Sequence, residues 1–418
     1  MATNTHSAVG VRWNRLRVVW YALLVALLVA GAYGGYLRIT EGLQSTNLSS
    51  SVPWGAWVAF YIYFVGLSAG AFLVSTLSNV FGVERLHEIE REALFVAIIS
   101  MIVALLFVLV DLGQMGRLWH PFVWRQPLSV LSWEVHAYVL YITVLCGELY
   151  FSMRGDLVEK RDEGGLRGKL AGILTLGRRG RSEQALETDR RWLKRLGLIG
   201  IPLAVVFVHG GTGNLYAVAA TREYWFSALF PVIFITSAVV SGMALIALIY
   251  VVRTSLTERE FDYDLLNLMG LLLVGFILID ASLKILEAFV GLYSLHSGEM
   301  ATWMTIMTGE MWWSFWFVMV GMGWVVPLAL LHRERWRIQP RFVGLAGASA
   351  VLGIIGTRFN IVVPAQVQPS LDGLFGGFYL PSTPELLLSI GLIALGAVIY
   401  TIGIELLPLV PEDGETHD

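Results

Sequence analysis

The sequence predicts an all-α, polytopic membrane protein in which about ten helices cross the bilayer. Hydrophobic residues make up 56% of the 418 residues, charged residues only 15%, and the mean hydropathy is +0.67. Soluble domains carry about a quarter charged residues, so this composition is that of an integral membrane protein. An internal repeat further predicts two tandem four-helix bundles, flanked by two peripheral helices.

Ten apolar stretches reach or approach the roughly 20 residues that a helix needs to cross a bilayer. In chain order they are 18–37, 54–80, 93–112, 131–153, 196–220, 227–252, 265–290, 311–331, 341–361 and 385–406. The first stretch is too long for a signal-peptide core and is expected to be a retained helix. The expected layout is an N-terminal segment with helix 1 (1–53), a first bundle (54–220) that contains a cytoplasmic loop (154–195), a second bundle (227–361), and an outer loop, last helix and acidic tail (362–418).

The basic residues predict the orientation. Of the 29 lysines and arginines, 23 fall on the side of the N-terminus, twelve of them in the 154–195 segment, and only 4 fall on the opposite side. Cytoplasmic loops carry the excess of positive charge, and an even number of spans returns the chain to its starting side. Both termini are therefore expected in the cytoplasm.

The repeat places a carboxylate at matching points of the two bundles. Phe107-Val108-Leu109-Val110-Asp111 returns as Phe276-Ile277-Leu278-Ile279-Asp280. The small-residue patch of residues 66–70 is answered by residues 238–242, and such patches let helices approach closely. His209 and Arg358 then occupy similar levels of the fifth and ninth helices. The two units are expected to share one orientation and to be related by an axis along the membrane normal.

Ionisable residues concentrate in the outer halves of the predicted helices. Buried charges in a bilayer are rare and are by default candidates for function. The outer set is Asp111, Arg117, His120, Glu134, His136, His209, Asp280, Lys284 and Arg358.

Each of these residues also has a purely structural interpretation. Asp280 and Lys284, at i and i+4, could neutralise each other as an ion pair. Asp111 could pair with Arg117, and His209 could be a packed histidine at a helix kink before the Gly210–Gly213 segment. Glu134 and His136 could be ordinary interfacial residues.

Metal and haem ligands are scarce. The single cysteine, Cys146, lies in an apolar run and cannot form an intrachain disulfide, an iron–sulfur site or a structural zinc site. Only His136 and His209 are plausibly within helices, so no second histidine pair exists for a di-haem cytochrome. We therefore expect this chain to hold no metal, no haem and no iron–sulfur cluster.

Several motifs together resemble the NrfD/PsrC family of integral membrane subunits. Val52-Pro53-Trp54-Gly55 leads into the helix that carries the 66–70 patch, and Asp111-Leu112-Gly113 continues to Arg117-Leu118-Trp119. His209-Gly210 stands in the fifth helix, and residues 379–385, Tyr-Leu-Pro-Ser-Thr-Pro-Glu, open the last one. The resemblance covers about residues 50–406 and is to the ten-helix branch. Gln114-Met115 departs from the family pattern, which has Arg-Pro there.

The resemblance implies a subunit of a respiratory oxidoreductase complex that exchanges electrons and protons with quinone or menaquinone near the outer face of a bacterial or archaeal cytoplasmic membrane. Proton acceptors are needed at each ring oxygen. Asp111 and His209 are expected to line a quinone pocket in the first unit, with Arg117, His120, Glu134 and His136 around it. Asp280 would act with Lys284 and Arg358 in the equivalent region of the second unit, as a proton path or a second pocket, unless the three residues are an inert relic.

The resemblance also implies partners. Electrons would pass to or from an iron–sulfur protein that docks on the outer face against residues 113–130 and 362–384. A further catalytic subunit with molybdopterin or several haems is expected beyond it.

Other functions stay open from the sequence. A structural membrane anchor without a quinone site predicts that the buried charges can be replaced pairwise by apolar residues. A secondary transporter would share the repeats, but the polar residues lie on the outer side rather than at the midplane. A di-haem cytochrome b would show a Soret band.

Overall fold

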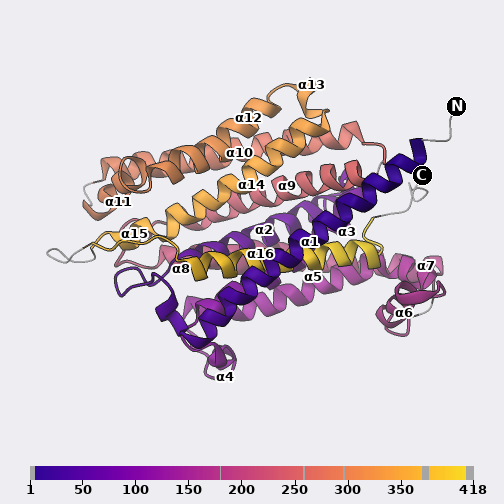
Figure 1. Cartoon of the computed structure of the whole chain (residues 1–418), viewed down its shortest axis with the longest axis horizontal. Coiled ribbons are helices and arrows are strands. Elements are labelled where there is room, and N and C mark those ends of the chain that lie inside the picture. Colours follow the sequence, from indigo (N-terminus) through magenta and orange to yellow (C-terminus); the bar gives the residue numbers. More distant parts are fainter. Residues whose placement is uncertain (1–4, 179, 258, 295–296, 370–375, 411–418) are drawn as a thin grey trace.

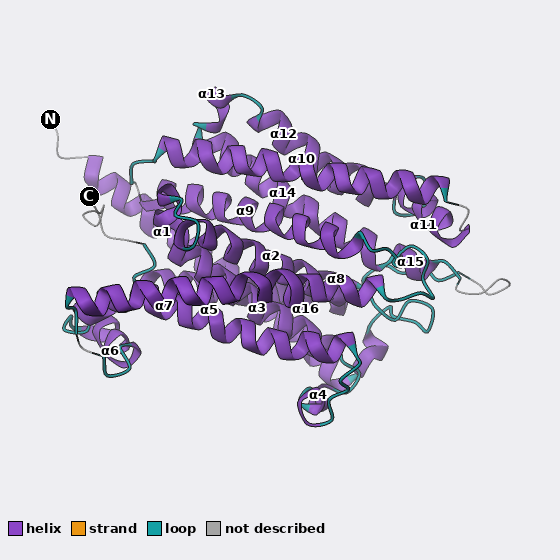
Figure 2. Cartoon of the chain, turned by 180° about the vertical axis from the view of Figure 1, so that it is seen from behind, coloured by secondary structure: helices purple, strands orange, loops and turns teal. Residues whose placement is uncertain are grey.

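The computed structural model describes residues 5–178, 180–257, 259–294, 297–369 and 376–410. Every regular element in this part of the chain is a helix, as Figure 2 shows, and the predicted all-α class is confirmed. The expected acidic tail and part of the 362–384 loop lie outside the described residues. The elements in order are α1 (Thr5–Thr40), η1 (Gly42–Ser45), α2 (Ala56–Asn79), η2 (Glu84–Leu86), α3 (His87–Asp111), η3 (Met115–Arg117), α4 (His120–Val123), α5 (Val130–Lys160), α6 (Gly165–Leu174), α7 (Glu183–Pro202), η4 (Leu203–His209), α8 (Gly210–Ala217), α9 (Phe230–Thr257), α10 (Tyr263–Tyr293), α11 (Ser297–Met307), η5 (Ser314–Val325), α12 (Val326–Leu331), α13 (Glu334–Arg337), α14 (Pro340–Val362), α15 (Pro364–Val367) and α16 (Thr383–Leu406).

Ten helical spans within the described residues are long and apolar enough to cross a bilayer, which confirms the predicted number. The chain is therefore a multi-pass membrane protein. Successive spans run back and forth along one axis, and α1 begins at the same end of the molecule at which α16 finishes (Figure 1). Several spans, such as Val130–Lys160 and Tyr263–Tyr293, extend beyond the apolar stretches that predicted them, because polar residues continue these helices.

The 154–195 segment was expected to be a loop, yet most of it is helical. α5 continues to Lys160, α6 follows, and α7 begins at Glu183. Ser182 caps α7 by accepting a hydrogen bond from the Ala185 backbone N–H at 3.3 Å. Arg154 and Asp189 form a buried ion pair that ties α5 to α7. Hydropathy marks only the lipid-crossing part of a helix, so the extensions were missed.

Gly210–Gly213 was expected to form a turn, but these residues continue the helix as the start of α8. The irregularity lies just before them, where Leu203–His209 is π-helical directly after Pro202. Proline removes a backbone donor and disturbs the preceding turn, and π-helical segments occur preferentially at functional sites. The span runs unbroken from Glu183 to Ala217.

α2 is the central helix and packs against α3, α9 and α14. α5 lies against α3, α7 and η4, whereas α9 lies against α10 and α14, and η5 packs on α14. α1 runs along α16, which also touches α3 (Figure 1). The boundaries of the two repeat units, and the axis that relates them, remain predictions.

The two small-residue patches pack against each other where α2 crosses α9. A methyl group added at Gly70 would lie 1.9 Å from the Ala238 carbonyl oxygen, and one added at Gly242 would lie 2.1 Å from the Gly70 carbonyl carbon. Both distances are far below van der Waals contact. Only glycine permits this approach, in which the helix backbones touch.

We expect Gly70→Ala to separate α2 from α9 and to destabilise the protein by about 1–3 kcal/mol, as overpacking does in well-packed interiors. Thermal unfolding in detergent measures the change. Gly275→Ala is the matched control, because a methyl group at this position in α10 meets nothing within 4 Å. An equal melting temperature for Gly70→Ala and the wild type would contradict the close contact.

Candidate functional site

His209 and Arg358 meet between the two predicted units. His209 is the last residue of η4, and Arg358 lies on α14. Arg358 Nη2 is 3.5 Å from His209 Nε2 and donates to Ser237 Oγ at 2.8 Å. The guanidinium carbon lies 4.8 Å from the centre of the Phe234 ring. Residues that the sequence assigned to matching positions in separate units therefore share one site.

The guanidinium group of Arg358 is buried, and only some of its N–H donors make hydrogen bonds. The residue is 0% exposed, and its Nε and Nη1 have no hydrogen-bond partner. No carboxylate lies within ion-pair distance of it among the described residues, although Asp280 is its main electrostatic partner. A buried charge without partners costs several kcal/mol. The unpaired donors therefore mark a place where a ligand with acceptor oxygens would be stabilised.

A second buried cluster surrounds Glu134, which is 1% exposed. One carboxylate oxygen, Oε1, accepts hydrogen bonds from Tyr61 at 2.8 Å, from Thr212 at 2.5 Å, and from Tyr138. The other oxygen, Oε2, has no partner. Glu134 is therefore no interfacial residue. It is a buried carboxyl group with one oxygen saturated by hydroxyl groups and one available.

Asp280 and Lys284 form the ion pair that their spacing allowed. Lys284 Nζ lies 2.6 Å from Asp280 Oδ2, which also accepts from the Trp324 indole at 3.3 Å. Asp280 is 0% exposed and Lys284 6%. Asp280 Oδ1 has no partner.

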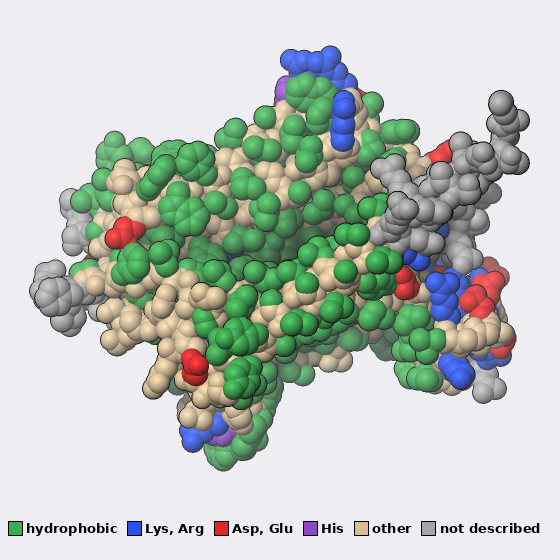
Figure 3. All heavy atoms as spheres, in the orientation of Figure 1, with side chains coloured by type: hydrophobic (Ala, Val, Ile, Leu, Met, Phe, Trp, Pro, Cys, Tyr) green, Lys and Arg blue, Asp and Glu red, His purple; other side chains and the backbone are tan. Residues whose placement is uncertain are grey.

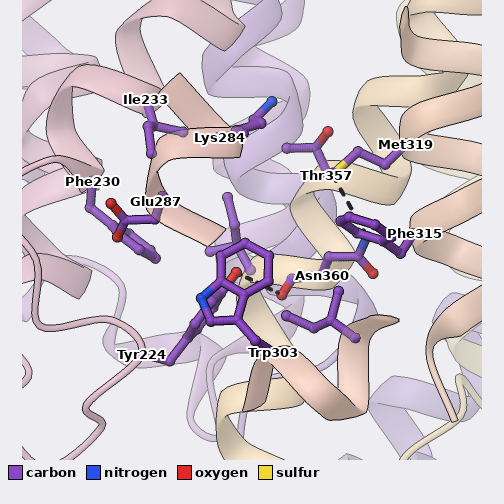
Figure 4. A pocket seen from close by; sticks show the side chains of 12 residues that line it. Tyr224, Phe230, Ile233, Lys284, Glu287, Trp303, Phe315, Met319, Thr357 and Asn360 are labelled. Atoms are coloured by element: carbon purple, nitrogen blue, oxygen red, sulfur yellow. Dashed lines mark hydrogen bonds between the residues drawn. The ribbon is translucent and has the colours of Figure 1, made fainter. Parts of the chain in front are cut away.

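A small cavity adjoins this pair. Figure 4 shows its lining side chains, which come from α9, α10, α11, η5, α14 and the segment before α9, and include Lys284, Glu287, Trp303 and Asn360. Its volume is about 30 Å³, the share of one water molecule in the liquid. A water molecule fits into this cavity, whereas an aromatic or quinone ring would fit only if the lining side chains moved. Its lining is mostly apolar, but Trp303 Nε1 and Asn360 Oδ1 are buried without a partner.

Asp111 is the last residue of α3, and no contact joins it to His209 among the described residues. Arg38 of α1 donates to the carbonyls on either side of it, from Nε to Val110 O at 2.8 Å and from Nη2 to Leu112 O at 2.6 Å. No ion pair joins Asp111 to Arg117 in the described part of the chain, and Arg117 is exposed on η3. The cation that faces Asp111 comes from helix 1, which the sequence had assigned to the periphery.

His120 and His136 lie outside the buried clusters. His120 stacks edge-on against Trp119, with ring centres 4.4 Å apart. His136 bonds through Nδ1 to Ser132 O at 2.7 Å, and its ring lies against Phe122. The structure therefore brings His209 together with Arg358, and Asp280 with Lys284, but brings neither His120 nor His136 to them.

The motif at residues 379–385 holds the start of α16 against the start of α2. Ser382 and Glu385 form a capping box at the start of α16. Tyr379 donates to Glu385 Oε1 at 2.5 Å and accepts from the Ala56 backbone N–H at 2.6 Å. Burial, together with the Glu385 carboxylate, raises the pKa of Tyr379, so its hydroxyl remains protonated as a donor.

The sequence is similar to known proteins over most of its length. The model of the family described as polysulphide reductase, NrfD, matches residues 44–370. The chain belongs to the NrfD family. This NrfD-family chain is 39% identical to a selenate reductase subunit of Mesobacillus selenatarsenatis, over 96% of each chain. It is 28% identical to the Hdr-like menaquinol oxidoreductase integral membrane subunit of Archaeoglobus fulgidus, over 94% of this chain and 95% of that one. It is 23% identical to the menaquinone reductase integral membrane subunit of Nitratidesulfovibrio vulgaris, over 96% of this chain and 93% of that one.

Sequence reasoning missed the hydroxyl-bearing members of the site in this NrfD-family chain. Tyr61, Tyr138, Thr212 and Ser237 are uncharged and frequent in apolar helices. One signal was present, because Tyr138 stands four residues after Glu134 and therefore on the same helix face. The lateral neighbours could not be inferred from one helix alone.

We expect Asp280→Leu to destabilise the protein by about 3–5 kcal/mol, because it leaves Lys284 buried without its partner. The double variant Asp280→Leu/Lys284→Met removes both charges and is expected to recover most of the loss. Thermal unfolding of the three proteins in detergent measures the coupling between the two side chains. Equal melting temperatures for the single and double variants would contradict a buried pair.

Proposed function

We propose that this chain is the membrane subunit of a respiratory oxidoreductase complex and that it exchanges electrons and protons with a quinone near the outer face. Three similar proteins are named as subunits of a selenate reductase, a menaquinol oxidoreductase and a menaquinone reductase. Two of these names refer to menaquinone or its reduced form, menaquinol, and all three refer to a reductase or oxidoreductase. The resemblance in motifs points to the same class.

The unpaired donors of Arg358 carry the proposal. A quinone presents two carbonyl oxygens, and each accepts hydrogen bonds. Arg358 Nε and Nη1 are buried, charged and without a partner beside His209. A ring oxygen there would satisfy the guanidinium and would be stabilised by a charge-assisted hydrogen bond. We therefore centre the headgroup on His209 and Arg358, rather than on His209 and Asp111 as the sequence suggested.

Proton exchange needs acceptors near the ring. Oxidation of a quinol releases two protons and two electrons, and histidine and carboxylate are the usual acceptors. His209 is one such group. Thr212, three residues further on the same helix, donates to Glu134, whose second oxygen is available. We propose that Glu134 takes up or supplies the second proton through this hydroxyl, and that Asp280 and Lys284 set the charge balance around Arg358.

The electrons would leave through an iron–sulfur partner on the outer face, with a further catalytic subunit that carries molybdopterin or several haems. The 113–130 segment offers a surface for docking outside the spans. Trp119, Trp124 and Leu128 there are 49%, 62% and 99% exposed. Large apolar side chains in a cluster are typical of a partner interface.

We propose the cytoplasmic membrane of a bacterium or archaeon as the location, with both termini in the cytoplasm. Basic side chains gather over α6 and α13, at the end where α1 begins and α16 finishes (Figure 3). Under the positive-inside rule this end faces the cytoplasm. The His209–Arg358 site then lies toward the opposite, outer side.

We expect Arg358→Lys to lower kcat/KM for quinol-linked electron transfer by about 10- to 100-fold, the usual consequence of losing a buried charged hydrogen bond. Lysine keeps the charge but loses the fork of donors. Arg154→Lys is the matched control and is expected to leave turnover unchanged, because Arg154 is a second buried arginine but pairs with Asp189. The measurement is turnover of a quinol analogue by the purified complex.

We expect His209→Ala to lose turnover while the partner proteins still co-purify with the chain. His209→Gln, which keeps a hydrogen-bonding side chain, should bind a quinone analogue but transfer electrons slowly. Normal turnover in both Arg358→Lys and His209→Ala complexes would reject the site and favour a structural anchor. Loss of co-purification in His209→Gln would also contradict the proposed role.

A further inference from the structure

A second cavity lies at the basic end of the molecule, far from the His209–Arg358 site. Its volume is about 310 Å³, ten times that of the cavity beside Lys284. Its walls come from the ends of α5, α9 and α16 and from α6. This volume is at the lower limit of the range for ligand pockets.

The polar lining of this basic-end cavity is mostly cationic. Lys160, Arg167, Arg253 and Arg259 line it, against two carboxylates. One of these, Glu405, already accepts a hydrogen bond from Tyr21 at 3.1 Å. The lining cations outnumber the lining carboxylates, and the positive charge available to an anion lies on Arg167 and Arg259, because Arg253 also pairs with carboxylates outside the lining.

Arg253 gives the cavity a fixed, buried cation. Its side chain is 5% exposed, and it pairs with Glu88 at 3.4 Å and Glu92 at 3.3 Å. Arg167 and Arg259 differ, since both are exposed and neither makes an ion pair with another described residue. The cavity therefore combines a preorganised arginine with two arginines available to a ligand.

The remaining lining is apolar. Ile404, Leu406, Leu407 and Val410 line one side, and Leu157 another. A free phosphate ion would gain nothing from these side chains. A molecule with an anionic head and hydrocarbon tails would contact both kinds of lining.

α6 indicates that a membrane surface lies at this level. Leu166 and Ile173, seven residues apart on one face of α6, are 66% and 70% exposed. Arg167 and Lys169 stand between them. The helix lies beside the bundle at the end of α5 (Figures 1 and 2). A short helix with exposed leucine and isoleucine beside basic residues fits the boundary between headgroups and acyl chains.

We propose that the basic-end cavity binds the phosphate headgroup of an anionic phospholipid. Arg167, Arg253 and Arg259 would hold the phosphate, and the apolar side chains of α16 would contact the acyl chains. Basic pockets between transmembrane helices bind anionic lipid headgroups in this way. The bound lipid would tie α6 and α16 together at the cytoplasmic end.

The test uses the full-length chain, delipidated in detergent, with lipid binding followed by native mass spectrometry. Arg167→Gln/Arg259→Gln is expected to weaken binding of phosphatidylglycerol by about 10- to 30-fold, since each basic residue near a membrane surface contributes a few-fold in affinity. Arg333→Gln/Arg335→Gln removes the same charge at the same end but away from the cavity, and is expected to bind as the wild type does. Glu163→Gln, which removes a carboxylate from the rim, is expected to strengthen binding.

The outcomes distinguish an anionic lipid from free phosphate, from a neutral lipid and from nonspecific electrostatic attraction. Equal losses in the two arginine double variants would mean diffuse attraction and would overturn the site. Equal binding of phosphatidylcholine would overturn the choice of an anionic lipid. A rise in melting temperature with inorganic phosphate alone, equal to that with phosphatidylglycerol, would overturn the lipid as the source. If Arg167→Gln/Arg259→Gln does not fold, Glu163→Gln provides a separate test, because binding equal to that of the wild type would contradict the proposal.

Discussion

The close approach of α2 and α9 is the constraint on which the rest of the structure depends. Gly70 and Gly242 let the two helices touch, and Gly66 lies one turn from Gly70 on the same face of α2. A methyl group at Gly66 would lie 3.0 Å from Arg358 Nη2 and 3.3 Å from His209 Cε1. The same stripe of small residues therefore joins the two halves of the protein and leaves the space in which their polar side chains meet. A larger side chain on this stripe would disturb both packing and site.

The buried charges of the protein fall into two kinds. Asp280 with Lys284, and Arg154 with Asp189, are paired at short distance, so their desolvation is offset by direct attraction. Arg358 and Glu134 are as deeply buried, but neither makes an ion pair with another described residue. Polar atoms without a partner occur in both kinds, for example Asp280 Oδ1 and Arg154 Nη2 in the first and Arg358 Nη1 and Glu134 Oε2 in the second. Pairing makes the charges of the first kind compatible with an apolar interior, whereas no opposite charge at ion-pair distance offsets the desolvation of the second kind.

The sequence predicted the properties that depend on one helix at a time. Hydropathy gave the ten spans, and i, i+4 spacing gave the Asp280–Lys284 pair, because both are local in the chain. Contacts between helices could not be predicted from the sequence. His209 and Arg358 were placed at one depth but in separate pockets, because nothing in the sequence shows that two side chains 149 residues apart lie next to each other. The resemblance assigned Asp111 to the same pocket as His209, yet the structure gives it Arg38 as a neighbour. Hydroxyl groups such as that of Thr212 carry no charge and therefore left no signal.

The C-terminal end of α1 and the N-terminal end of α16 connect the proposed docking surface to the candidate site. Arg38 of α1 holds the carbonyls around Asp111, and a cation at the C-terminal end of α3 is also favoured by the helix dipole. Residues 113–130 follow directly from that point. On the other side, Glu385 of α16 is bonded to Tyr379, which in turn holds the first N–H of α2. Both segments are thus fastened to the frame that includes α2, whose Gly66 lies against Arg358 and His209. A partner seated on these segments would rest on a firmly held support, which would keep its distance from the His209–Arg358 site constant, as the electron transfer proposed above would require.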